Sequence, residues 1–122
     1  MPGTMVSVTG GAYWSITPAQ LYSLLIQPTR DFLLVDADVE YIGEIATTNL
    51  FINSANIGQE LGKFPSDKTA KIVLYCTSGV HSAEAAVILV QAGYTRVMNL
   101  AGGIIAWQQQ GYVTVNNRRT MT

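Results

Sequence analysis

The sequence predicts an α/β fold, a parallel sheet of about five strands in three layers with helices on both faces. Two short apolar runs, at residues 32–35 and 72–75, lack polar alternation, which is typical of strands buried on both faces. Helix-like segments alternate with these runs along the chain. The 122 residues fit one domain of ordinary size.

The N-terminal half contains four predicted elements. Residues 1–12 are rich in small residues and predict a loose lead-in, with a short strand at most at residues 6–8 and a flexible turn at Gly10-Gly11. Thr17-Pro18 predicts a helix start, because a hydroxyl can cap and proline suits the first turn; Pro28 ends this helix. The strand at 32–35 ends at Asp36. A short helix is expected at residues 38–42 and a weak strand at 51–57.

The C-terminal half is clearer. Residues 72–75 predict a strand, and residues 82–92 predict a helix that Ser82 caps and Gly93 closes. A strand follows at 96–100, and Gly102-Gly103 permits a sharp turn into a short helix that ends at Gly111. We expect a lead-in at residues 1–15, one domain at 16–115 and a polar tail at 116–122, with Arg118 and Arg119 solvated. Trp107, Tyr75 and Tyr41 are assigned to packing.

Composition limits the class of partner. Seven basic and eight acidic residues give a net charge of −1, so no electrostatic footprint for nucleic acid or an anionic membrane is present. Charged residues make up 12%, against about 25% in an average domain, which predicts a neutral surface or a face covered by a partner. No apolar stretch reaches the roughly 20 residues of a membrane span. A single cysteine and no signal-like start predict a cytoplasmic protein, and we expect no metal and no cofactor.

Cys76 is the most informative residue. It follows the apolar strand at 72–75 and precedes a short loop, residues 77–82, that opens into a helix. A tight loop that feeds a helix turns N–H groups inward, and the helix N-terminus adds positive charge, so the site favours a thiolate. The alternative is a small buried core residue, which is a common role for a free cysteine.

Three chemistries use a thiolate held by amides. Acyl transfer needs a histidine base, and His81, which is only five positions away in the same loop, is poorly placed for it. Phosphoryl chemistry needs a guanidinium, and no arginine occurs between Cys76 and Arg96. Sulfur transfer needs only an anion-binding loop, which backbone amides and the hydroxyls of Thr77, Ser78 and Ser82 could form.

Three segments carry a resemblance to a known family: Tyr75-Cys-Thr-Ser-Gly-Val-His-Ser82, Ala92-Gly-Tyr94 and Leu100-Ala-Gly-Gly-Ile-Ile-Ala-Trp107. Together with Asp36, Glu40, Tyr41 and Gly43 they make residues 16–112 resemble a single-domain rhodanese. The resemblance implies that Cys76 accepts a sulfane sulfur as a persulfide, with Asp36 as a supporting residue. It also implies a persulfide-binding loop formed by Thr77, Ser78, Gly79, Val80, His81 and Ser82. Phosphatases of this fold have a loop one residue longer.

This chain departs from the family pattern at three positions. Thr77, His81 and Asp38 stand where thiosulfate-using members commonly have arginine. Each lost charged hydrogen bond weakens dianion binding by about 1.5 to 3 kcal/mol, which predicts weak thiosulfate turnover. The loop is similar to that of mercaptopyruvate sulfurtransferases, with Ser78 at the assisting position, which favours a less anionic donor. His81 either supplies a titratable charge or is an exposed loop residue.

The predicted function is therefore that of a sulfurtransferase. The expected donor is a small sulfur compound or a persulfide-bearing protein, and the sulfur passes to a thiol, to cyanide or to a partner protein. The alternative is a rhodanese-like binding module with little or no turnover.

Overall fold

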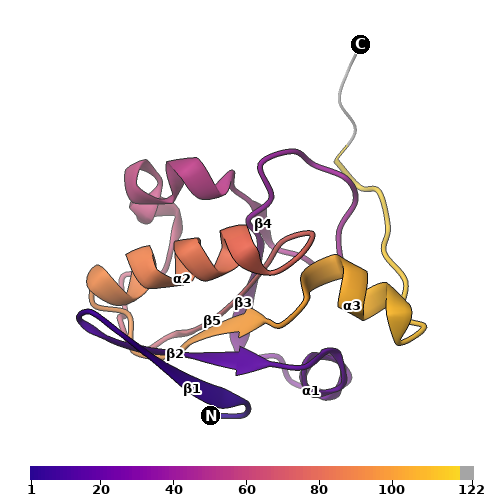
Figure 1. The fold of residues 1–122 in the computed structure, drawn as a ribbon, viewed down its shortest axis with the longest axis horizontal. Coiled ribbons are helices and arrows are strands. Elements are labelled where there is room, and N and C mark those ends of the chain that lie inside the picture. Colours follow the sequence, from indigo (N-terminus) through magenta and orange to yellow (C-terminus); the bar gives the residue numbers. More distant parts are fainter. Residues whose placement is uncertain (119–122) are drawn as a thin grey trace.

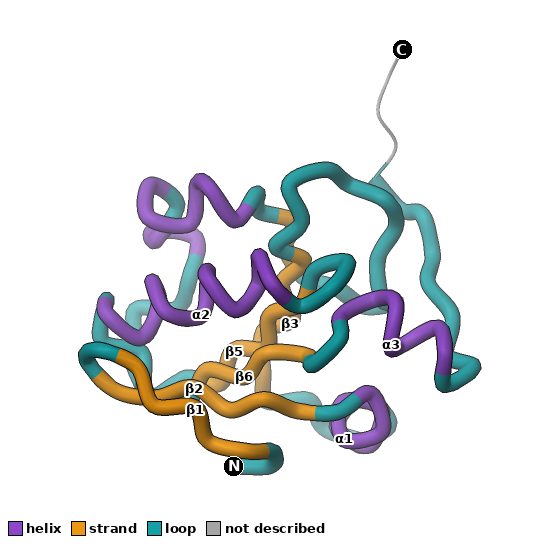
Figure 2. Tube along the Cα trace, in the orientation of Figure 1, coloured by secondary structure: helices purple, strands orange, loops and turns teal. Residues whose placement is uncertain are grey.

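The computed structural model describes residues 1–118, and its centre is a six-stranded sheet with the order β1-β2-β6-β5-β3-β4 (Figures 1 and 2). The strands are β1 (Thr4–Val8), β2 (Gly11–Ile16), β3 (Phe32–Asp36), β4 (Leu50–Phe51), β5 (Lys71–Tyr75) and β6 (Val97–Leu100). All neighbouring pairs are parallel except β1 with β2. The predicted α/β fold is confirmed, with five parallel strands and one antiparallel edge strand.

Helices cover both faces of the sheet. Helix α2 (Val80–Gln91) lies on one face with two 3₁₀ helices, η1 (Ser54–Gln59) and η2 (Leu61–Lys63), and helices α1 (Pro18–Leu25) and α3 (Gly103–Gln109) lie on the other (Figure 1). Strand β5 serves both layers: Ile72 and Leu74 pack under α2, whereas Val73 and Tyr75 join the cluster under α1 and α3. Alternate side chains therefore enter opposite cores, which explains the continuous apolar run.

Helix α1 begins as the sequence predicts. Thr17 Oγ1 accepts the Gln20 N–H at 3.1 Å, and Gln20 Oε1 accepts the Thr17 N–H at 2.9 Å, which forms a capping box. Pro18 occupies the first turn, where its missing N–H costs no hydrogen bond.

The expectation of a loose segment at residues 1–12 is wrong. These residues enter a hairpin in which β1 pairs antiparallel with β2, and β2 pairs parallel with β6. Thr9 and Gly10 form its turn between the paired residues Val8 and Gly11, and Gly10 has a positive φ of 94°. The short strand expected at residues 6–8 is present and extends over Thr4–Val8, as an edge strand whose side chains are exposed or only half-buried.

Three further expectations need correction. Residues 38–42 form no helix, and the predicted strand at 51–57 is limited to Leu50–Phe51, after which the chain turns into η1. Helix α2 begins at Val80 with Gly79 as its N-cap, so Ser82 lies inside the first turn and does not cap it. In these regions side chains form hydrogen bonds with residues distant in the sequence: Asn53 with Val39, Asp38 with Thr77, and Ser82 with Asn99. Local sequence contains no signal for such bonds.

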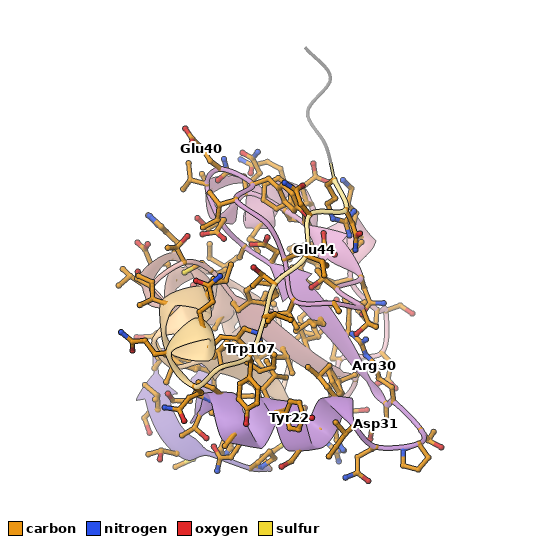
Figure 3. All side chains as sticks on the ribbon, turned by 90° about the vertical axis from the view of Figure 1, so that its right-hand side faces the viewer. Tyr22, Arg30, Asp31, Glu40, Glu44 and Trp107 are labelled. Atoms are coloured by element: carbon orange, nitrogen blue, oxygen red, sulfur yellow. The ribbon has the colours of Figure 1, made fainter. Side chains whose placement is uncertain are left out.

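The segment that follows α3 returns along residues 41–48. Val115 forms a two-way backbone bridge with Glu44, and Arg118 Nε lies 2.8 Å from Glu44 Oε1, a carboxylate that is 2% exposed. Glu44 lies beside this segment in Figure 3. Arg118 is therefore paired with a buried carboxylate, contrary to the expectation that it is solvated. Arg119 lies outside the described residues. Within residues 1–118, no helix has the length and apolar character required to cross a membrane.

Candidate active site at the β5–α2 loop

Three hydrogen-bond donors converge on the sulfur of Cys76. The N–H of Gly79 lies 3.1 Å from Sγ, and the N–H and hydroxyl of Ser82 each lie 3.3 Å from it. The thiol is fully buried, and Gly79 reaches its position with φ 93°, in the left-handed region that favours glycine. This arrangement stabilises negative charge on sulfur without a guanidinium or an ammonium group.

The first residues of helix α3 bind the carbonyl groups of the loop on the side away from the sulfur, so the N–H groups of the loop face the sulfur. The Ile104 N–H donates to Cys76 O at 2.8 Å, and the Ile105 N–H donates to Thr77 O at 3.0 Å. This close approach requires Gly103, because a Cβ there would clash with Cys76 O and φ is 58°. Gly102-Gly103 therefore does more than permit a turn: it allows the helix start to dock against the sulfur-binding loop.

Asn99 of β6 also belongs to the site, although no local sequence pattern identifies it. The Ser82 hydroxyl lies 2.5 Å from Asn99 Oδ1, and Asn99 Nδ2 donates to Gly79 O at 3.2 Å. Asn99 thereby orients two of the residues that contact the sulfur. The feature that could have identified Asn99 is a polar side chain within an apolar strand. All four residues of this strand are buried, and a buried polar side chain needs a hydrogen-bond partner.

Asp36 and Asp38 lie behind the loop. Asp38 Oδ1 accepts both the N–H and the hydroxyl of Thr77, each at 2.7 Å, and Asp36 Oδ1 accepts the Asp38 N–H at 3.1 Å. Burial, together with a side-chain hydrogen bond that the neutral Asp36 donates to Asp38, raises the pKa of Asp36 to about 8. Asp36 therefore supports the loop only through Asp38, the residue that directly holds Thr77.

A cavity of about 380 Å³ lies over the loop. Its lining residues are Asp38, Val39, Glu40, Ile42, Thr77, Ser78 and His81. The half-exposed His81 side chain places Nδ1 3.3 Å from Glu84 Oε1, so a carboxylate faces the imidazole. Two carboxyl residues and no lysine or arginine line this cavity. The buried Cys76 is not among its lining residues, but the next two residues of the chain, Thr77 and Ser78, are. Val80 of the predicted persulfide-binding loop is 63% exposed and does not line this cavity.

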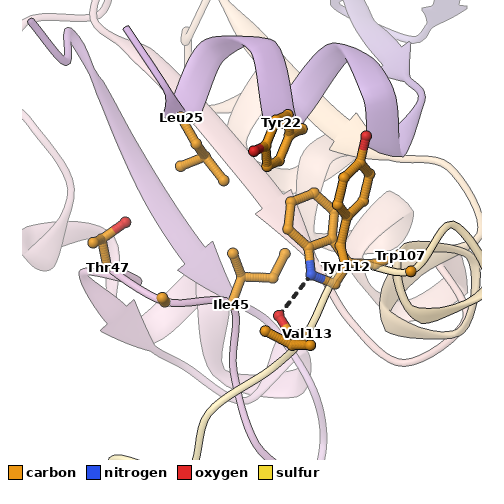
Figure 4. Close-up of a pocket in the computed structure, with 9 residues that line it drawn as sticks. Tyr22, Leu25, Ile45, Thr47, Trp107, Tyr112 and Val113 are labelled. Atoms are coloured by element: carbon orange, nitrogen blue, oxygen red, sulfur yellow. Dashed lines mark hydrogen bonds between the residues drawn. The ribbon is translucent and has the colours of Figure 1, made fainter. Parts of the chain in front are cut away.

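A larger cavity, about 460 Å³, lies between α1, residues 45–47 and the end of α3 (Figure 4). Tyr22 stacks on Tyr112 at 4.6 Å, and the Trp107 indole N–H donates to Val113 O at 2.9 Å. No thiol, imidazole or carboxyl group lines it. Of these two cavities, only the one over the Cys76 loop is therefore lined by carboxyl and imidazole side chains.

A comparison with protein-family models matches residues 17–110 to the rhodanese-like domain. The chain belongs to this family. Its predicted family membership is thus confirmed. The matched residues contain β3 to β6 and the helices α1, α2 and α3, whereas β1 and β2 precede them.

Relatives of this rhodanese-like domain are named as sulfurtransferases. It is 41% identical over 100 residues to a probable adenylyltransferase/sulfurtransferase, MoeZ, of Mycobacterium tuberculosis, covering 79% of this chain and 25% of the relative. It is 39% identical over 85 residues to a sulfurtransferase of Allochromatium vinosum, covering 68% of this chain and 78% of that protein. The chain thus spans about a quarter of MoeZ but most of the second relative.

A solved structure shares the fold of this rhodanese-like domain. The crystal structure of a rhodanese-related protein from Thermoplasma volcanium superposes with a TM-score of 0.68 at 25% identity, covering 83% of this chain and 96% of that one.

Proposed function

We propose that this rhodanese-like domain is a sulfurtransferase that carries a sulfane sulfur on Cys76 as a persulfide. The observation that carries the proposal is the convergence of the Gly79 and Ser82 donors on a single sulfur. In a persulfide the negative charge lies on the outer sulfur, and inward amides of the loop bind such an anion without a metal or a base. The relatives named as sulfurtransferases support this assignment.

The transfer is two displacements at sulfur. The Cys76 thiolate attacks the outer sulfur of a donor persulfide, R–S–SH; the donor S–S bond breaks, a new S–S bond forms on Cys76, and the donor leaves as a thiolate. An acceptor thiolate, or cyanide, then attacks the outer sulfur of the Cys76 persulfide and restores the Cys76 thiolate. No external oxidant or reductant is needed, because each step moves the sulfane sulfur from one nucleophile to another, and the thiolate that leaves takes up the electron pair of the broken S–S bond.

We further propose that the donor is a thiol persulfide, small or protein-borne, and that thiosulfate is a poor donor. Asp38 and Glu40 line the cavity over the loop, where no lysine or arginine is present among its lining residues. A dianion such as thiosulfate meets repulsion there and no guanidinium to bind it. A persulfide carries at most one charge, and its organic part can contact Val39 and Ile42, whose side chains are 48% and 55% exposed.

One observation favours a second candidate, a binding module with little or no turnover. The Cys76 side chain is fully buried, so the loop must shift before any donor reaches the sulfur. The apolar side chains of Val39, Ile42 and Val80 around it are exposed and suited to a protein contact.

Mass spectrometry after incubation with a thiol persulfide distinguishes the two. We expect the intact protein to gain one sulfur atom, Cys76→Ser to gain none, and cyanide to remove the added sulfur as thiocyanate. An unreactive thiol with thiol persulfides and thiosulfate alike would contradict sulfur transfer and support the binding module.

A further inference from the structure

Two buried carboxyl groups lie side by side behind the sulfur-binding loop, with half of their oxygens unpartnered. Asp36 is fully buried and Asp38 is 3% exposed. Their Oδ1 atoms accept three hydrogen bonds, whereas Asp36 Oδ2 and Asp38 Oδ2 have no partner among the described residues. Buried polar atoms are nearly always hydrogen-bonded, so this pair of atoms requires an explanation.

We propose that Asp36 and Asp38 share one proton between their Oδ2 atoms, and that this acid pair positions the sulfur-binding loop through Thr77. A proton on Asp36 Oδ2 donates to Asp38 Oδ2 and partners both atoms at once. Two carboxyl groups confined to one buried site hold a single charge, because two negative charges there repel each other without solvent to screen them.

The hydrogen bonds show which residue carries the proton. Asp38 Oδ1 accepts two donors from Thr77 at 2.7 Å, which favours the ionised form of Asp38. Asp36 Oδ1 accepts only the Asp38 N–H, at 3.1 Å. Asp36 is therefore the neutral acid, and its raised pKa agrees with this assignment.

The other ionisable groups near the pair do not neutralise it. Glu44 and Tyr75 face Asp36; Glu44 is bound by Arg118, and the Tyr75 hydroxyl is bonded to Ile45 N–H and Thr48. On the loop side lie the Cys76 thiol and the cavity residues Glu40 and His81. No lysine or arginine within residues 1–118 forms a salt bridge with either aspartate. A shared proton accounts for both Oδ2 atoms without a cation beside them.

The pair acts on the loop through one residue. Asp38 binds the backbone and side chain of Thr77, the first residue after the nucleophile, whose carbonyl is held by Ile105. Loss of the shared proton places two carboxylates against each other, so Asp38 must move and release Thr77. Asp38 is therefore a positioning residue. The effect on sulfur loading rests on the proposed function, whereas the shared proton does not.

Infrared spectroscopy tests the shared proton without any sulfur chemistry. We expect the wild-type protein at neutral pH to show the C=O band of a protonated carboxylic acid, and Asp36→Asn to lack it. Asp36→Asn keeps the geometry, because its Nδ2 can donate to Asp38 Oδ2 in place of the proton. Asp38→Asn is the second variant: its Oδ1 still accepts from Thr77, its Nδ2 donates to Asp36, and the band is again lost.

The pH profile tests the positioning role. We expect sulfur loading of the wild type to fall about tenfold within one pH unit above the pKa of Asp36, while Asp36→Asn loses no loading over this range. Asp67→Asn is the matched control: Asp67 accepts the N–H and hydroxyl of Thr69 in the same pattern, but on an exposed turn. It should keep both the band and the wild-type profile.

Each outcome decides the proposal. A wild-type spectrum without a protonated-carboxyl band, or with a band that both variants keep, overturns the shared proton. Equal pH profiles for Asp36→Asn and wild type overturn the positioning role. If no donor loads Cys76, the proposed sulfur transfer is contradicted, while the infrared result still tests the shared proton. Hydrogen exchange of the Thr77 N–H then tests the positioning role: the loop should loosen at high pH in the wild type and not in Asp36→Asn.

Discussion

The hydroxyl of Ser82 lies between Cys76 and Asn99, 3.3 Å from Sγ and 2.5 Å from Asn99 Oδ1. A hydroxyl has one hydrogen, so it donates either to the sulfur or to the amide oxygen. Negative charge on the sulfur draws this hydrogen toward Sγ, whereas a neutral thiol leaves it on Asn99. The hydroxyl can thus follow the charge of the sulfur during transfer.

Ser82→Ala should slow sulfur loading of Cys76. The substitution removes one donor to a charged sulfur, worth about 1.5 to 3 kcal/mol, which corresponds to a loss of about tenfold to a hundredfold in rate. Stopped-flow measurement of loading with a thiol persulfide gives the rate. Ser23→Ala, at an exposed position on α1, is the matched control and should load at the wild-type rate. A wild-type rate for Ser82→Ala would show that the hydroxyl does not stabilise the reacting sulfur.

Gly103→Ala should destabilise the fold and disrupt the loop. The added Cβ would clash with Cys76 O and would lie 2.6 Å from Thr77 O, in a left-handed backbone conformation. The strain and the clash together should lower the free energy of unfolding by about 2 kcal/mol or more. Urea denaturation measures this loss. At Gly62, a Cβ meets nothing within 4 Å, so Gly62→Ala should unfold at the wild-type urea concentration; an equal loss in both variants would refute the docking argument.

His81→Arg should improve thiosulfate as a donor. A guanidinium at the edge of the cavity can bind the dianion in two-point contact, which predicts a gain of about tenfold or more in kcat/KM for thiosulfate. Thiocyanate formation measures turnover. Gln27→Arg adds the same charge just after α1, at the end of the sheet opposite Cys76. The same gain in both variants would mean that net charge, and not a local contact, limits thiosulfate use.

The stability of the protein should depend on pH through Asp36. The folded state keeps this proton up to about pH 8, whereas the unfolded chain releases it near 3.8, the ordinary pKa of an aspartate side chain. Because the folded state binds more protons in that window, the contribution of Asp36 to the free energy of unfolding falls as pH rises. Asp36→Asn removes this slope, so its stability relative to wild type should increase between about pH 5 and about pH 8.

Urea denaturation at the two pH values measures this change. Asp67→Asn is again the control, because the pKa of Asp67 is lowered by its Thr69 hydrogen bonds and the residue stays ionised throughout the window. A constant difference between Asp36→Asn and wild type would contradict the raised pKa of Asp36.

Local sequence determined the elements whose signals lie within a few residues. The Thr17-Pro18 start specified α1 by its own capping geometry, and the apolar runs in β3 and β5 required burial on both faces. The position of Cys76, between a buried strand and a helix, followed from the same signals.

Tertiary structure alone decided what surrounds the sulfur. Asp38 meets Thr77 across 39 positions, and Asn99 meets Ser82 across 17, so neither contact has a local pattern. The same holds for the hairpin at residues 4–16, which depends on pairing with β6, and for Arg118, which reaches Glu44 across 74 positions. Propensity and periodicity describe how a segment folds against its nearest neighbours, whereas these bonds form only after the sheet has brought distant strand ends together.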